Sequence, residues 1–354
     1  MGPDLASPEV RVIRGKYLED ILDEPRALQA TVENLDIPQP LDDLAQRLAE
    51  GQFRRIVLTG MGSSLHALQP LSLQLIDHGF TAVMVETSEL VHYKPRLLDS
   101  ETLTIAVSQS GQSAEIIRLA EVNQNRSAVI AVTNTPQSPL AHHSSAALFT
   151  HAGSEFSVSC KTYITALMVL KFLGDILCQG DLEQSRRELK KAPSAADEYL
   201  SRWNDHVDVL ARKLRRVGQL FLVGRGPSLA AVGTGALIIK ESDHFHAEGM
   251  SSAAFRHGPF ELLSGDTFVV VFSGDAKTRD LNRRLAADIQ QAGGHAEFIG
   301  EDSPLDAFRL PEISESVRPI LEILPVQMMT IALAALRNRE AGKFERAAKI
   351  TATE

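Results

Sequence analysis

Cysteine is scarce in this chain of 354 residues, and basic residues are outnumbered by acidic ones. Two cysteines, Cys160 and Cys178, are too few for a disulfide scaffold and favour a reducing compartment such as the cytoplasm. Asp and Glu total 45 against 36 Lys and Arg, which gives a formal net charge of −9. The chain therefore lacks the basic surface typical of nucleic-acid binding, and we expect no nucleic-acid partner.

Long hydrophobic runs are also missing. The longest apolar stretch, LPVQMMTIALAAL (324–336), is too short and too interrupted for a bilayer span, so we expect no membrane partner. The amino-terminal MGPDLASPEVRVI contains acidic residues and no apolar core, unlike a secretory signal. Hydrophobic residues make up 44% and charged residues 23%, a composition typical of a soluble globular protein with room for two domains.

Short runs rich in valine and isoleucine alternate with longer segments of helical spacing. The runs RRIVLTG (54–60), TAVMVETS (81–88), TLTIAVSQ (102–109) and SAVIAVTN (127–134) are apolar over consecutive residues, as strands buried on both faces are. The alternation of strand and helix predicts an α/β protein built on doubly wound parallel sheets.

The same pattern returns later in the chain. GQLFLVGRGPS (218–228) resembles RRIVLTGMGSS (54–64), and Gly224 follows Gly60 by 164 residues. TFVVVFSGD (267–275) matches LTIAVSQSG (103–111) at the same lag, which predicts a duplicated domain. We expect a helical lead-in over 1–39, domains over 40–185 and 206–340, a helical connector over 186–205 and a tail over 341–354.

Two turns in the first domain, TGMGSS (59–64) and SQSGQS (108–113), are crowded with small polar residues. Parallel sheets bind ligands at the carboxyl ends of their strands, where the free N–H groups of helix starts attract anions. Serine hydroxyls add donors, and glycine permits a close approach of the backbone. Such residues could also serve only as loop and cap residues, but two such turns in one domain favour a cup for a phosphate monoester.

The residues missing from these turns exclude other classes of phosphate ligand. Neither turn contains lysine or the GxxxxGK[ST] pattern, so a nucleoside triphosphate loop is not expected. GMGSSL and GRGPSL lack the third glycine of a dinucleotide fingerprint, which argues against an oxidoreductase. The second-domain copies, VGRGPS and FSGDAK, contain fewer hydroxyls, so we expect one cup in the duplicated unit.

These turns, together with GRGPSLAAVGTGALIIKESDHFHAEGMSSAAFRHGPFEL, resemble the sugar isomerase (SIS) domain family. The resemblance is nearest to the isomerase half of glucosamine-6-phosphate synthases and to stand-alone phosphosugar isomerases and deaminases. YLEDILDEPRALQATVEN (17–34) and FERAAKITATE (344–354) are similar to the lead-in and the tail there. The resemblance implies two tandem flavodoxin-like domains. With no cysteine before Cys160, we expect no glutaminase domain and no use of glutamine.

The resemblance also implies roles for individual residues. Glu241 matches the family's proton-shuttling glutamate, although alone it could be an ion-pair partner of Lys240. His257 in FRHGP matches a histidine that assists ring opening in the neighbouring subunit's site, although a lone histidine could equally cap a turn. Lys349 matches a lysine near the active site. The expected phosphate and substrate contacts are Gly62, Ser63, Ser64, Ser108, Gln109, Ser110, Ser113 and Ser159, with Lys161 as a further candidate.

A metal site is a weaker hypothesis at Asp243, His244, His246 and Glu248. On a helix, His244 and Glu248 would share a face, but His246 would point elsewhere and the H-E-x-x-H pattern is absent. We therefore expect no metal and no organic cofactor. Ile238 and Ala254 stand where the synthases have lysine and glutamate, which puts the synthase substrates in doubt.

The sequence thus predicts a cytoplasmic phosphosugar aldose–ketose isomerase, or a glucosamine-6-phosphate deaminase, acting on a hexose or hexosamine 6-phosphate. The resemblance further implies a homodimer whose active site is shared between subunits. The alternative is a non-catalytic sugar-phosphate sensor. SIS domains in transcription factors are joined to DNA-binding domains, and we find no basic recognition helix in the short segment before 40.

Overall fold

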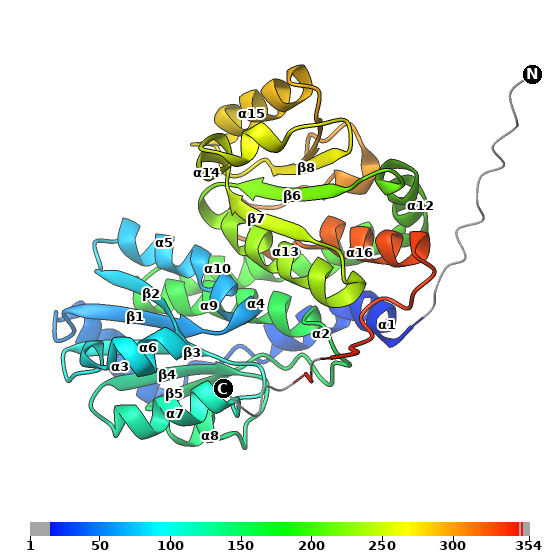
Figure 1. Cartoon of the computed structure of the whole chain (residues 1–354). Helices are drawn as coiled ribbons and strands as arrows, with labels where there is room; N and C mark the ends of the chain where they lie inside the picture. The colour runs from blue at the N-terminus through cyan, green and yellow to red at the C-terminus, as the bar shows by residue number, and fades with distance from the viewer. Residues whose placement is uncertain (1–14, 347, 350–354) are drawn as a thin grey trace, which may run out of the picture.

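The structure, a computed structural model, describes residues 15–346, 348 and 349. Two parallel sheets lie on either side of a layer of helices (Figure 1). The first has the order β2-β1-β3-β4-β5, and the second β7-β6-β8-β9. In each, the first strand in sequence lies between the second and third, which is the doubly wound order of flavodoxin-like folds. The α/β prediction of two tandem parallel-sheet domains is confirmed.

The strands are short and are joined by helices. They are β1 (Arg55–Gly60), β2 (Ala82–Glu86), β3 (Thr102–Val107), β4 (Ala128–Thr133), β5 (Ala146–Phe149), β6 (Gln219–Gly224), β7 (Ala247–Ser251), β8 (Thr267–Phe272) and β9 (His295–Ile299). The four runs proposed as strands in the first domain are β1 to β4. Strand β5 was not predicted, because its four residues, AALF, are too few to show a pattern.

The helices divide into a lead-in, two repeats and a connection between them. The lead-in comprises α1 (Lys16–Leu22), α2 (Glu24–Glu33) and α3 (Gln39–Ala49). The first repeat contains α4 (Gly62–Ala67), α5 (Gln69–Asp77), α6 (Thr87–Tyr93), α7 (Ala114–Asn123), α8 (Pro139–His142) and α9 (Lys161–Leu177). The connection is α10 (Leu182–Leu189), α11 (Ala192–Leu200) and α12 (Trp203–Leu214). The second repeat contains α13 (Leu229–Asp243), α14 (Ser252–Arg256), α15 (Arg279–Gln291) and α16 (Leu324–Leu336).

One large core joins the two sheets. Successive strand side chains point to opposite faces, so Leu58 of β1 and Leu222 of β6 face inward and share a core with α9, α13 and α16. Their chain neighbours, Val57 and Val223, face outward into two smaller cores. Helices α6, α7 and α8 cover the outer face of the first sheet, and α14 and α15 that of the second (Figure 1).

The strand register corrects one detail of the repeat. Gly60 of β1 pairs with Val107 of β3, and Val223 of β6 pairs with Val271 of β8. Gly224 is the equivalent of Gly60, 164 residues later, and by the same register it stands beside Phe272. Phe272 is therefore the equivalent of Val107, and these two residues are 165 positions apart. The lag of 164 expected for this second segment was therefore wrong by one residue.

The carboxy-terminal core helix is the most apolar segment. The helical stretch Arg318–Leu336 is long and apolar enough to cross a membrane by length and composition. It begins six residues before the apolar run that was judged too short from the sequence. Of its 18 most apolar consecutive residues, 89% are buried inside the protein, so core packing accounts for the apolar composition.

Candidate active site

The two polar turns of the first repeat lie side by side at the carboxyl edge of its sheet. They follow β1 and β3, which are hydrogen-bonded neighbours up to the pair Gly60 and Val107. The first turn passes through Gly62 with φ +51°, a left-handed conformation that favours glycine, and enters α4 there. This position is where a doubly wound sheet binds its ligand.

Both turns and the start of α9 line one cavity. Its polar lining comprises Ser63, Ser64, Gln109, Thr133, Thr150, Ser159, Thr162 and Tyr163. We call this cavity the phosphate cup, after the ligand that the sequence predicts for it. Of the predicted contacts, the structure thus brings Ser63, Ser64, Gln109 and Ser159 together. Four lining residues were missed, because a lone threonine or tyrosine at a strand end or a helix start gives no sequence signal of its own: Thr133, Thr150, Thr162 and Tyr163.

The remaining predicted contacts belong to the same two turns but do not line the cavity. Ser108 Oγ accepts a hydrogen bond from Gly111 N at 3.1 Å, and Ser110 Oγ accepts one from Gln112 N at 3.4 Å. As acceptors in these bonds, both hydroxyls keep their own hydrogens for another partner. Ser113 is the residue before α7, and within the described residues its side chain caps no backbone N–H of that helix. Neutral donors therefore gather around the cup.

Glu241 lies in the last turn of α13, which packs against α4. A Cβ added at Gly62 would lie 3.3 Å from Leu237 Cδ2, and Glu241 is one helical turn beyond Leu237 on the same face. Its half-buried carboxylate makes no hydrogen bond or ion pair with any residue that the structure describes. Burial raises its pKa to about 7, against the opposing charges of Lys240 and Lys349 and with a contribution from Glu155.

Lys349 reaches the same region from the carboxy-terminal tail. Its Nζ donates to Glu155 Oε2 at 2.8 Å and to the carbonyl oxygen of Ser157 at 3.3 Å. The side chain of Glu155 is 1% exposed. Sequence reasoning missed Glu155, which lies within EFSVSCKTYITAL but belongs to no recognised pattern. The predicted tail residues 347 and 350–354 lie outside the described residues.

Two other candidates lie elsewhere. Lys161 is buried at the start of α9, where it forms ion pairs with Asp20 at 2.9 Å and Asp23 at 3.1 Å, so it faces the lead-in helices. His257 is exposed just after α14, at the end of the second sheet where α13 begins. Glu241 is about 18 Å further along α13, by the rise per residue of a helix. The structure therefore does not bring His257 to Glu241 within one chain.

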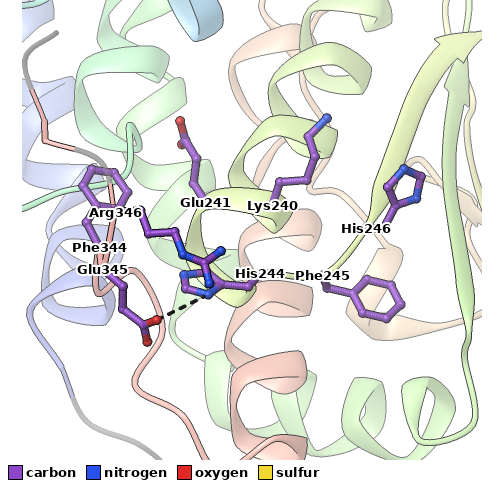
Figure 2. Close-up of a pocket in the computed structure, with 8 residues that line it drawn as sticks. All are labelled: Lys240, Glu241, His244, Phe245, His246, Phe344, Glu345 and Arg346. Carbon is purple, nitrogen blue, oxygen red and sulfur yellow. Dashed lines mark ion pairs between the residues drawn. The ribbon is translucent and has the colours of Figure 1, made fainter.

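The metal hypothesis rested on a helix that does not extend far enough. Helix α13 ends at Asp243, and His244 adopts a left-handed conformation with φ +52°. Glu248 belongs to β7, so the expected shared face of His244 and Glu248 was wrong. His244 instead lies 3.8 Å from Glu345 of the tail, and His246 lies apart from it (Figure 2). Among residues 15–346, 348 and 349, no group of three metal-ligating side chains is arranged around a common point.

The second repeat has the same turn but fills it with its own carboxylates. Gly226 has φ +57°, like Gly62, and Ser228 occupies the place of Ser64. The Oγ of Ser228 donates to Glu322 Oε1 at 2.7 Å, and Glu322 is only 2% exposed. Burial raises the pKa of Glu322 to about 7, with opposing contributions from Ser228 and the Arg318 guanidinium.

Two further carboxylates occupy backbone donors of the other turn of the second repeat, which follows β8. Asp275 Oδ1 accepts from Thr278 N at 3.1 Å, and Glu315 Oε1 accepts from Ala276 N at 3.0 Å. Asp275 and Glu315 thus place negative charge at the end of the second sheet. Donors of both turns in the second repeat are thus already bonded within the chain.

Comparisons with known proteins agree with this architecture. The family model of the SIS domain matches twice, over residues 52–174 and 213–337. A "Glutamine--fructose-6-phosphate aminotransferase [isomerizing]" of Pyrococcus horikoshii is 31% identical over 352 residues, which cover 95% of this chain and 57% of that protein. The chain thus spans little more than half the length of this relative.

Solved structures show the same fold. The C-terminal domain of glucosamine-fructose-6-phosphate aminotransferase from Francisella tularensis has a TM-score of 0.81 at 20% identity, covering 93% of this chain and 98% of that one. Glucosamine-6-phosphate deaminase from Thermotoga maritima has a TM-score of 0.77 at 20% identity, covering 96% and 100%. With both repeats matched by the family model, the chain belongs to the SIS domain family.

Proposed function

We propose that the protein is a phosphosugar aldose–ketose isomerase acting on a hexose or hexosamine 6-phosphate. The observation that supports this most is the half-buried, unpaired Glu241, whose pKa is raised to about 7, beside a cup of neutral donors. The cup would hold the phosphate, and α13 would present the carboxylate to the carbons of the opened sugar. The names of the relatives, isomerizing aminotransferase and glucosamine-6-phosphate deaminase, support the same substrate class.

The chemistry follows from a base beside a carbonyl. In its ionised form, Glu241 removes the proton from the carbon next to the carbonyl, and the electron pair forms an enediol or enolamine. The resulting oxyanion lies near a cation if Lys349 points to it from the tail. Protonated Glu241 then returns the proton to the neighbouring carbon, which moves the carbonyl by one position. The protein's own residues suffice for these steps.

Ring opening must precede this transfer, and we assign it to His257 of a second copy of the chain. His257 is exposed and lies far from Glu241 in its own chain, so a homodimer would supply it across the interface. With an amino sugar, the same proton transfer gives a ketose imine. Addition of water to that imine releases ammonia and leaves the ketose phosphate, which would make the protein a deaminase.

The test is an assay of wild type and Glu241→Gln against a panel of hexose and hexosamine 6-phosphates. Ketose phosphate and ammonia are measured separately, so isomerase and deaminase activities are distinguished. The proposal predicts turnover of at least one sugar phosphate by wild type and its loss in Glu241→Gln. Binding of a sugar phosphate without turnover of any member would instead identify a non-catalytic sensor.

A further inference from the structure

The loop before α9 contains a buried carboxylate with an unusually full set of partners. Glu155 Oε1 accepts from the backbone N–H groups of Cys160 and Thr162, both at 2.9 Å. These N–H groups belong to the start of α9 and have no partners within the helix. A carboxylate at this position stabilises both the free donors and the positive end of the helix dipole.

The second oxygen of Glu155 serves a different purpose. Oε2 accepts from Thr162 Oγ1 at 2.8 Å and from Lys349 Nζ at 2.8 Å. Capping of α9 is already achieved by Oε1, so Oε2 is free to bind a segment nearly 200 residues away in sequence. Lys349 has one other acceptor among the described residues, the carbonyl oxygen of Ser157 at 3.3 Å.

The same carboxylate is connected to the phosphate cup. Thr162 lines the cup, and its hydroxyl lies 3.1 Å from Ser159 Oγ, another cup residue. Glu155 thus determines the orientation of one wall of the cup through Thr162. Since it also binds Lys349, a single side chain links one wall of the cup to the tail cation.

Glu241 lies within the electrostatic reach of this pair. Its neighbouring charges are Lys240 on its own helix, Glu155 from the loop before α9 and Lys349 from the tail. Glu345 and Arg346 of the tail line a surface pocket together with Glu241 (Figure 2). Removing the Glu155–Lys349 pair therefore alters both the position of one cation and the field at the carboxylate.

We propose that Glu155 is the positioning residue of this site, holding Lys349 beside the phosphate cup while it orients the cup wall through Thr162. This inference rests on the proposed function, in which Lys349 faces the developing oxyanion. The earlier part of the tail has its own anchors. Gly342 accepts a hydrogen bond from Ser157 Oγ and donates one to the carbonyl oxygen of Ser242. Loss of Glu155 would thus release the end of the tail without detaching all of it.

Glu155→Gln separates positioning from helix capping. The amide carbonyl can still accept from Cys160 N and Thr162 N, and the amide NH₂ can donate to Thr162 Oγ1, so the cup wall keeps its contact with residue 155. The same NH₂ would face the Lys349 ammonium, and two donors cannot bond to each other. Glu155→Asp keeps the charge but is one methylene shorter. Glu297→Gln is a matched control, because Glu297 of the edge strand β9, in the second repeat, pairs with Lys213 of α12.

The first readout is the rate at which Lys349 is acetylated by a limiting amine-reactive ester, followed by peptide mass spectrometry on the full-length protein. We expect Glu155→Gln to raise this rate roughly five- to tenfold, since a hydrogen bond to a charged group is lost. Glu155→Asp should give a smaller increase, and Glu297→Gln should raise the rate at Lys213 alone. An unchanged rate at Lys349 in Glu155→Gln overturns the proposal.

The second readout separates kcat from binding. Glu155→Gln should lower kcat roughly tenfold, while calorimetry should show inorganic phosphate binding within about twofold of wild type. Lys349→Met should show the same loss of kcat. The double variant should lose no more kcat than Lys349→Met alone, because Glu155 acts through Lys349. This comparison remains valid even if Glu155→Gln is less stable than wild type. Additive losses overturn the proposal. If wild type turns over no sugar phosphate, the proposed function fails, and the acetylation rates still decide the role of Glu155.

Discussion

The hydroxyl of Ser228 donates to the buried carboxylate of Glu322, 2.7 Å away, at the position equivalent to Ser64, which lines the cup in the first repeat. The two turns have nearly the same backbone, with φ of +57° at Gly226 and +51° at Gly62. One duplicated turn therefore offers its donors to a ligand, and the other satisfies them internally. This asymmetry explains how two equivalent turns can give one binding site.

Serine substitutions in the two turns should affect different properties, ligand binding in the first repeat and stability in the second. Ser64→Ala removes a donor from the cup, so we expect it to weaken binding of inorganic phosphate and of fructose 6-phosphate by roughly tenfold. Ser228→Ala is the matched control and should leave both affinities unchanged, while lowering the thermal midpoint because Glu322 loses its donor. Calorimetry should give one phosphate per chain. Two phosphates per chain, or weaker binding in Ser228→Ala, would contradict this assignment.

Glu322 should make stability depend on pH. Its pKa is about 7 in the folded protein and near 4.5 when unfolded. Between these values the folded protein holds a proton that the unfolded chain has released, so the free energy of unfolding falls as pH rises through this window. The full difference corresponds to about 3 kcal/mol.

Glu322→Gln removes this titration and keeps an acceptor for Ser228. We expect the variant to be more stable than wild type by about 1 to 3 kcal/mol at pH 8, and equal to it near pH 4. Urea unfolding at the two pH values measures this difference. A variant less stable than wild type at pH 8 would show instead that the ionised carboxylate is held by Arg318.

The ionisation of Glu241 should control how kcat/KM depends on pH on the acid side of the optimum. As a base it must be ionised, so kcat/KM should rise with pH through an apparent pKa of about 7. Because Lys349 lowers the pKa of Glu241, Lys349→Met should move this rise to higher pH. Glu241→Gln should lower kcat by about 10² to 10⁴ and retain phosphate binding. If the apparent pKa of kcat/KM is unchanged in Lys349→Met, the charge of Lys349 does not act on Glu241, and this part of the account is wrong.

Part of this site could be predicted from the sequence, because it lies in local patterns. Apolar runs ending in TGMGSS and SQSGQS placed the cup at the end of the first sheet, and the lag revealed the repeat. Glu155 and Glu322 could not be found in this way. Each is a lone carboxylate in a loop, and its role arises only when tertiary packing brings Thr162 and Lys349, or Ser228, to it.

The end of helix α13 was the second feature that the sequence did not predict. His244 and Glu248 have helical spacing in the sequence, but α13 ends between them because His244 takes a left-handed conformation. No glycine or proline signals this end in KESDHFHAEG until Gly249. In the same way, the one-residue shift between the two turns is visible only in the pairing of β6 with β8.

His257 should act in trans. Glu241→Gln and His257→Ala are each expected to be inactive as homodimers. Random reassociation of equal amounts should restore roughly a quarter of wild-type activity, because half of the dimers are mixed and each mixed dimer contains one intact site. Mixing that restores no activity, with mixed dimers confirmed by mass spectrometry, would show that His257 does not serve a neighbouring site.

The central claim is that the first repeat holds the phosphate while the second supplies the carboxylate that moves the proton. A crystal structure with a 6-phosphorylated hexitol, which resembles the open sugar but cannot react, tests it most directly. The account predicts the phosphate among Ser63, Ser64 and Gln109, with carbons 1 and 2 next to the Glu241 carboxylate. A phosphate bound at Ser228, or a sugar chain directed away from Glu241, would contradict it.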